Sequence, residues 1–74
     1  MADPVYKSVE ITGTATTTVN DAIQNAVSKA GETLRNLDWF EVVNQRGFIK
    51  NGKVAEFQVV IKVGFRIESS KAGD

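Results

Sequence analysis

The most regular pattern in the chain is the alternation of apolar residues with other residues over positions 54–68. The apolar positions are Ala55, Phe57, Val59, Ile61, Val63, Phe65 and Ile67. Alternation at every second residue is typical of a strand that packs one face on a hydrophobic core. At about 3.3 Å per residue this strand would be roughly 50 Å long, well above the usual length. A chain of 74 residues has little material with which to cover it.

A helical pattern begins after Thr18, where apolar residues recur at three- and four-residue spacing. Residues 18–21 (Thr-Val-Asn-Asp) resemble a capping box with Asp in place of Glu, which marks a helix start. Because Leu34 and Leu37 keep the same phase, we expect the helix to pass through Gly31 and to span about 18 residues, or some 27 Å. Gly inside a helix costs about 1 kcal/mol relative to Ala.

Two shorter alternating stretches predict two more strands. Residues 5–12 predict a first strand that precedes the helix, and residues 38–50 predict a second strand that follows it. Asn44 and Arg46 interrupt the apolar parity of the second strand. We therefore expect a β-bulge near residues 45–47, where Gly is a natural participant.

The order of these elements predicts the topology. Asn51-Gly52 is a strong signal for a two-residue type I′ turn, which joins the second strand to the long third one. The first two strands run in the same direction, so an all-antiparallel sheet requires the third strand between them. The sequence predicts an α+β fold of the β-α-β-β type, with a three-stranded antiparallel sheet in the order 1-3-2 packed on one helix. That helix can cover about half of the third strand, and the rest needs another subunit.

Composition narrows the classes of function. Nine basic and nine acidic residues give a formal charge of zero, which argues against a dedicated nucleic-acid binder. Cys and His are both absent, so a nucleophile–base pair of those residues is excluded, and no acidic cluster resembles a metal site. Asp38 and Glu41 have no evident partner in the sequence. We therefore do not expect an enzyme.

Length and hydropathy predict a single domain over residues 1–74, with flexible ends at residues 1–4 and 69–74. No apolar run approaches the roughly 18 residues of a membrane span, and no signal peptide is evident. We expect a cytoplasmic protein that binds neither membranes nor nucleic acid. Because a domain this small without disulfides is commonly stabilised by association, we also expect a homo-oligomer.

One face of the predicted sheet carries a candidate ligand site. A Trp beside a Gly has an open ring face, because Gly has no side chain to cover it. Trp39, a floor of Val43 and Val60, and the carboxamide of Gln58 suit a flat heteroaromatic ligand, which needs stacking on its face and hydrogen bonds at its edge. On the pattern alone, Trp39 is more often a core or interface residue, and Gln58 is more often a solvated strand residue. The hairpin register pairs Gln45 with Gln58, Val43 with Val60, Glu41 with Lys62, and Trp39 with Gly64.

Binding energies limit a site built from one subunit. One stacking contact contributes about 1–3 kcal/mol, whereas micromolar affinity needs about 8 kcal/mol. A ligand enclosed between two symmetry-related Trp faces could reach that value, so the ligand and oligomer hypotheses support one another. Arg46, Lys50 and Lys53 are expected near the hairpin tip, either as phosphate contacts or as a solvated turn. Arg66 suits either an ion pair or a phosphate contact.

Four segments together carry a family resemblance. They are residues 33–42 (TLRNLDWFEV), 46–47 (RG), 57–59 (FQV) and 62–66 (KVGFR). With this spacing the chain resembles the dodecins, and closely their bacterial type, over residues 6–68. The resemblance implies a small flavin-binding protein with a strand–helix–strand–strand fold. It further implies a hollow dodecameric shell with the helices outside and the sheets lining the interior.

The resemblance also implies roles for individual residues. Trp39 matches the residue that stacks on the isoalloxazine ring, and Gln58 matches the residue that hydrogen-bonds the ring edge. Arg46 matches a position that reaches a flavin phosphate, while Arg66 has a similar part or binds coenzyme A at another junction. The implied function is storage or buffering of FMN or riboflavin, with protection against flavin photochemistry. The alternatives are a ligand-free oligomerisation module and a flavin-dependent enzyme, which would need a substrate pocket and a proton donor.

Overall fold

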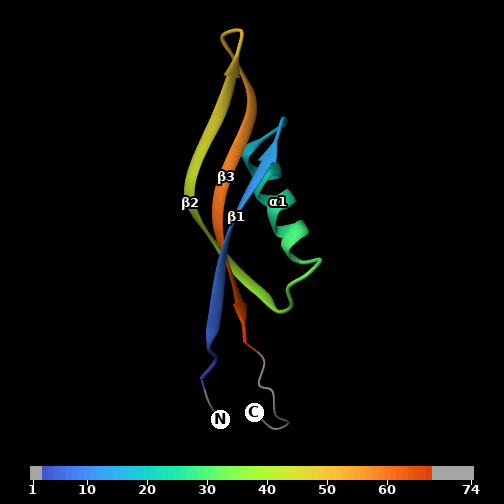
Figure 1. Ribbon diagram of the computed structural model, residues 1–74, viewed down its shortest axis with the longest axis vertical. Coiled ribbons are helices and arrows are strands. Elements are labelled where there is room, and N and C mark those ends of the chain that lie inside the picture. The colour runs from blue at the N-terminus through green and yellow to red at the C-terminus, as the bar shows by residue number, and fades with distance from the viewer. Residues whose placement is uncertain (1–2, 68–74) are drawn as a thin grey trace.

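The structure is a computed structural model in which residues 3–67 are described. Strand β1 (Tyr6–Ala15) is followed by helix α1 (Val19–Ala30) and by strands β2 (Leu37–Lys50) and β3 (Lys53–Arg66) (Figure 1). The three strands form one antiparallel sheet in the order β1-β3-β2, which confirms the predicted β-α-β-β topology. Of the ends predicted to be flexible, residues 1–2 and 69–74 lie outside the described part.

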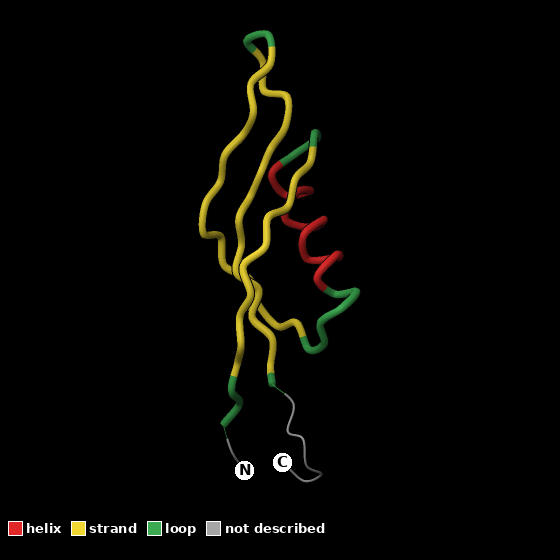
Figure 2. The backbone as a smooth tube through the Cα atoms, in the orientation of Figure 1, coloured by secondary structure: helices red, strands yellow, loops and turns green. Residues whose placement is uncertain are grey.

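The molecule is long and thin, with Cα extents of 57 × 20 × 13 Å. Its radius of gyration is 15.6 Å, whereas a compact domain of this length would have a value of about 11 Å. The last pair between β1 and β3 joins Ala15 to Phe57, and the β2–β3 hairpin continues beyond it as a two-stranded arm (Figure 2). This arm extends past both the end of β1 and the helix.

The hydrophobic core lies between α1 and the β1–β3 half of the sheet. Val59, Ile61 and Val63 of β3 are buried against the small residues that α1 presents. A Cβ atom at Gly13 would overlap the carbonyl oxygen of Ala22, so only Gly lets β1 and α1 approach this closely. The small helix residues in the contact are Ala22, Ala26 and Ala30.

Strand β2 lies outside this core. All of its residues except Leu37 are exposed, and α1 approaches β1 and β3 but not β2 within the described residues. Phe40 and Val42, which pair with core residues of β3, remain 49% and 46% exposed. The accessible surface is 5546 Å², against about 4,500 Å² for a compact protein of this mass. The prediction that the helix leaves part of the sheet uncovered is therefore confirmed.

The helix begins as predicted and ends earlier than predicted. The Thr18 hydroxyl accepts a hydrogen bond from the Asp21 amide at 2.9 Å, which is the expected N-cap. The expected passage through Gly31 is wrong, because Gly31 is the C-cap and α1 has only 12 residues. Leu34 keeps its helical phase because the amides after Gly31 still donate back to the helix. The Glu32 amide donates to the Lys29 carbonyl at 3.1 Å, and the amides of Thr33 and Leu34 donate to the Ala30 carbonyl at 3.2 and 2.9 Å. The chain then turns at Asn36, which has a positive φ of 62°.

The β-bulge expected near residues 45–47 is wrong, because residues 44–48 pair with β3 without a break, and the bulges lie on either side of this segment. Phe48 pairs with Glu56 but Ile49 pairs with Val54, so β3 has an extra residue there, and Val43 is an extra residue in β2. These two irregularities cancel, so the predicted pairs Glu41–Lys62 and Trp39–Gly64 are confirmed. Between them the register differs by one residue, so the predicted pairs Gln45–Gln58 and Val43–Val60 are wrong. Arg46 faces Gln58 and Asn44 faces Val60. The bulge at Val43 thus turns these two polar residues away from the side of the sheet that packs on the helix.

Candidate functional site

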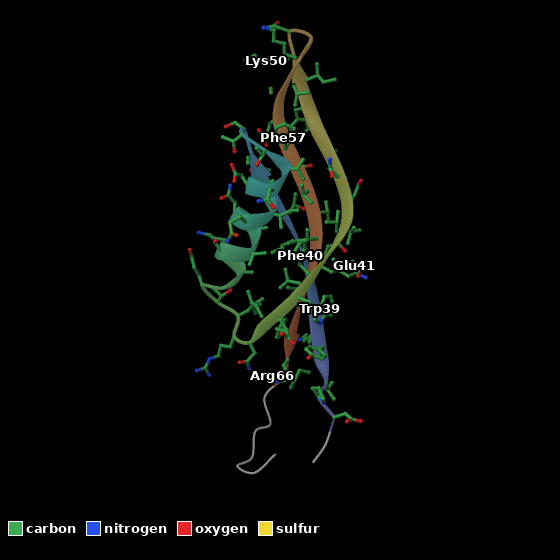
Figure 3. The ribbon with its side chains drawn as sticks, turned by 180° about the vertical axis from the view of Figure 1, so that it is seen from behind. Trp39, Phe40, Glu41, Lys50, Phe57 and Arg66 are labelled. Carbon is green, nitrogen blue, oxygen red and sulfur yellow. The ribbon has the colours of Figure 1, made fainter. Side chains whose placement is uncertain are left out.

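The candidate site lies on the face of the sheet opposite α1, which we call the open face. Paired residues in an antiparallel sheet project to the same side, so the register defines which residues belong to it. Within residues 3–67 no helix or other strand covers this face (Figure 3). Its members are Tyr6, Ser8, Glu10, Thr12 and Thr14 of β1, Trp39, Glu41, Asn44 and Arg46 of β2, and Gln58, Val60, Lys62, Gly64 and Arg66 of β3.

Trp39 lies flat on the sheet, directly over Gly64. A Cβ atom at Gly64 would overlap Cδ2, Cε2 and Cζ2 of the indole, which include both atoms of the ring junction. The centre of one ring face therefore rests on the backbone of β3, and Gly64 is buried beneath it. Trp39 remains 41% exposed. The Gly thus provides a seat for one face of the indole, and the opposite face is the one available for stacking.

Tyr6 and Asp38 complete this end of the open face. The Tyr6 ring lies with its centroid 6.3 Å from that of Trp39, at an interplanar angle of 58°. Its hydroxyl donates a 2.8 Å hydrogen bond to Oδ2 of Asp38. This hydrogen bond raises the pKa of the Tyr6 phenol above its usual value of 10.0, with desolvation and the Asp38 charge acting in the same direction and Arg66 opposing them.

Sequence reasoning missed the pair formed by Tyr6 and Asp38. The expectation that Asp38 lacks a partner is wrong. The two residues are 32 positions apart, and no local signal links them. Their contact depends on a further bulge, because Leu37 pairs with Phe65 and Trp39 with Gly64, which leaves Asp38 without an opposite residue. Only the alternation of the first strand, which places Tyr6 on the open face, was available from the sequence.

Gln58 and Arg46 form a second polar group on the open face. Nη1 of Arg46 donates a hydrogen bond to Oε1 of Gln58 at 3.2 Å, across the shifted part of the register. Arg46 is therefore placed beside the carboxamide rather than with Lys50 and Lys53 at the hairpin tip, where the sequence pattern placed it. A guanidinium group held in this way fixes the orientation of the amide that it contacts.

The Trp39 and Gln58 positions are on the same face but far apart within one chain. Gly64, beneath the indole, is separated from Gln58 by six positions of β3, or about 20 Å at the usual rise of a strand. A fused three-ring system is shorter than this. Val60 lies between the two groups, whereas Val43 is a bulged residue with no opposite partner in β3. One chain therefore offers two partial sites, a stacking seat at one end and a hydrogen-bonding edge at the other.

Other features of the described residues are less informative. An open groove between α1 and β1 is lined mainly by aliphatic side chains, together with Thr12, Lys29 and Thr33. Within residues 3–67 there is no group of three potential metal ligands. No helix in the same range is long and apolar enough to cross a membrane.

Comparison with known proteins gives one consistent result. The sequence profile of the Dodecin family matches residues 5–68. A curated dodecin from Thermus thermophilus is 52% identical over 66 residues, which cover 89% of this chain and 96% of that protein. The solved dodecin of Streptomyces coelicolor superposes with a TM-score of 0.87 at 48% identity, covering 95% of this chain and all of that one (100%). The tt0972 protein of Thermus thermophilus gives a TM-score of 0.87 at 50% identity, with 92% and 100% coverage.

Proposed function

The chain belongs to the dodecin family, and from this premise we propose that it stores and buffers a flavin, held between copies of itself. The family consists of small non-enzymatic proteins, so a flavin-dependent enzyme is not the main alternative. In this proposal the ligand is FMN or riboflavin, the assembly is a homododecamer, and the protein acts in the cytoplasm.

The observation that carries the proposal is the seat of Trp39 on Gly64. An exposed indole that lies flat, with one face on backbone and the other uncovered, is suited to stack on a flat aromatic ring. An isoalloxazine ring fits this requirement because it is planar and carries hydrogen-bonding groups along its edge. Gln58 supplies a carboxamide that can both donate to and accept from such an edge.

Two copies of the chain must contribute to one site. The stacking seat and Gln58 are about 20 Å apart within a chain, so a ring that touches both takes them from different subunits. Energetics favour the same arrangement, because one stack contributes about 1–3 kcal/mol and micromolar binding needs about 8 kcal/mol. The exposed strand β2 gives the chain a reason to associate, since association buries Phe40 and Val42.

The remaining candidate residues have supporting roles in this proposal. Val60 and Val43 contribute apolar floor beside the ring. Arg46 orients the Gln58 amide and is within reach of a phosphate brought close to it, which would favour FMN over riboflavin. Arg66, at the Trp39 end of the open face, is the second candidate for a phosphate, of FMN or of coenzyme A.

In this proposal the same geometry supports storage and photoprotection. A ring pressed between aromatic faces and enclosed by neighbouring subunits is withdrawn from solvent, so reactive partners reach it less readily.

Fluorescence titration with FMN and with riboflavin tests the proposal. The native protein should quench the flavin emission at a defined stoichiometry, and Trp39→Ala should abolish tight binding while leaving the assembly intact by native mass spectrometry. Trp39→Phe is the matched control, because it keeps a smaller ring and should retain part of the affinity. Unchanged quenching in Trp39→Ala would contradict the role of the indole.

The second candidate is a ligand-free oligomerisation module. The exposed apolar residues of β2 favour it independently of any ligand, because they explain association alone. It predicts the same assembly, with no bound flavin after purification and no response in either titration.

A further inference from the structure

Three side chains at the Trp39 end of the open face form a closed arrangement that the flavin proposal does not itself require. We propose that Tyr6 and Asp38 are positioning residues that hold the Trp39 indole flat on Gly64, so that the free chain presents one fixed ring face. The part of this inference that concerns ligand affinity rests on the proposed function. The part that concerns the order of the indole stands without it.

An indole on an exposed strand is not held in place by Gly64 alone. Gly64 makes room for the ring, since any Cβ atom there would overlap it, but room does not select one rotamer. A half-exposed Trp39 side chain free to change rotamer would have to be ordered when a ligand binds. That ordering would weaken the complex, so something beside the ring that already restricts it would improve stacking.

Tyr6 is placed to restrict the ring. Its centroid distance of 6.3 Å and its tilt of 58° to the indole define a tilted contact between aromatic rings rather than a stack. Such a contact limits motion of the indole. Ser8 is the β1 residue that pairs with Gly64, beneath the indole, and Tyr6 pairs with the next open-face residue of β3, Arg66. Because the Ser8 side chain is small, it leaves room for the indole beside β1.

Asp38 anchors Tyr6 in turn. The phenol donates a hydrogen bond to the carboxylate at 2.8 Å, and a charged acceptor makes this bond stronger than one between neutral groups. Asp38 directly precedes Trp39 and occupies the bulge, so its backbone is joined directly to that of Trp39. The Tyr6 ring contact, the hydrogen bond and the peptide link between residues 38 and 39 therefore connect β1 to β2 in a closed loop over the intervening β3.

The chain contains one Trp and one Tyr, which makes the inference directly measurable. Time-resolved fluorescence anisotropy of the ligand-free protein measures the motion of the Trp39 ring. Near-ultraviolet circular dichroism reports on the contact between the Trp39 and Tyr6 rings. Tyr6→Ala and Asp38→Ala should each increase fast local motion of the indole. Asp38→Asn should restore much of the order, because its amide oxygen still accepts from the phenol. Tyr6→Phe should have an intermediate effect, since it keeps the ring contact and loses the anchor.

Titration with FMN gives the second readout. Tyr6→Ala should lower the affinity about threefold to tenfold, as expected for the loss of one aromatic contact, and Tyr6→Phe should lower it less. Glu32→Gln is the matched control, because it changes an exposed carboxylate just after the end of α1, on the side of the sheet opposite the open face. It should change neither the anisotropy decay nor the affinity.

The outcomes separate this inference from the flavin proposal. An indole equally ordered in the native protein, Tyr6→Ala and Asp38→Ala overturns the positioning role, whatever the ligand result. If native protein binds no flavin but loses indole order in these variants, the proposed function fails and the positioning role remains. Should Tyr6→Ala or Asp38→Ala fail to assemble, the milder pair Tyr6→Phe and Asp38→Asn decides the same question, since only the former removes the hydrogen bond.

Discussion

The two halves of the sheet differ in how much of their apolar surface the chain itself covers. In the β1–β3 half, Val59 and Ile61 are fully buried under α1, with no exposed surface (0%). In the β2 half, Phe40 and Val42 project to the same side and stay 49% and 46% exposed. The residues are chemically alike, so the difference lies in what covers them. One half holds the fold together, and the other is available for association with further copies.

The length of the helix explains this division. Twelve residues of α1 extend only about 18 Å, and the helix lies over β1 and β3, while the molecule is 57 Å long. An exposed apolar strand at the edge of a sheet is a liability unless a partner covers it. The same strand carries Trp39, so the uncovered half is also the half that carries the candidate stacking site.

Truncating the core of the covered half should have the largest effect. Ile61→Ala removes buried methyl groups beneath α1 and should lower the free energy of unfolding by about 2–5 kcal/mol. Denaturation with urea measures this. Thr12→Ala, on the open face of β1, is the control and should change stability by less than about 0.5 kcal/mol. Equal losses in the two variants would remove the distinction between core and open face.

A charge in the uncovered half should act on assembly rather than on the core. Phe40→Glu places a carboxylate in the surface that we expect neighbouring copies to cover, and desolvating that charge is costly. Native mass spectrometry should show smaller species, with the helical signal in circular dichroism largely retained. Asn51→Asp, in the turn between β2 and β3, serves as the charge-matched control because it also adds one negative charge. An intact assembly in Phe40→Glu would mean that β2 is not an interface.

Filling the seat under the indole should affect the ligand more than the fold. Gly64→Ala places a methyl group where the ring junction of Trp39 now lies and should displace the indole. Loss of the stacking contact corresponds to about 1–3 kcal/mol, or roughly fivefold to 150-fold weaker FMN binding. Ser8→Ala, at the paired position of β1, should leave the affinity within about twofold, since it removes only a hydroxyl. If Gly64→Ala binds as the native protein does, the seat is not needed for stacking.

The smallest expected effect concerns the link between the halves, where Tyr6 of β1 meets Asp38 of β2. Because the hydrogen bond to Asp38 raises the pKa of Tyr6 in the folded state, the folded chain retains this proton more tightly than the unfolded chain. The resulting stabilisation is complete below pH 10.0 and is lost as the pH rises through the raised pKa. The stability difference between native protein and Tyr6→Phe should therefore shrink above that pH. A difference that grows instead would contradict the sign of this coupling.

Sequence reasoning reached the topology because its signals are local. Alternation over residues 54–68, the Thr18 cap and the Asn51-Gly52 turn each act within a few residues, and together they leave one antiparallel order. The helix end was misplaced because the phase of Leu34 persists through a turn that is no longer α-helix. Periodicity indicates which side a residue faces, but it does not distinguish an α-helix from a turn that places the residue on the same side.

The site was predicted less completely, for a physical reason. Bulges at Val43 and at Ala55 each shift the register by one residue in opposite directions, so Trp39 met Gly64 as expected while Gln58 gained Arg46 as its neighbour. Both bulge residues are common apolar residues, so neither position is marked as a bulge by its residue type. The contact between Tyr6 and Asp38 depends on tertiary structure alone. Faces and partners across β2 and β3 could thus be predicted outside the segment between the two bulges, but not within it.

The central claim is that one flavin site takes Trp39 and Gln58 from different copies of the chain, and mixed assemblies test it most directly. Trp39→Ala and Gln58→Ala chains, refolded separately, should each give particles with no complete site. Refolded together in equal amounts, they should regain tight FMN binding at about a quarter of the sites, since random mixing unites the intact residues that often. Mixed particles that bind no better than the separate ones would contradict a site shared between copies.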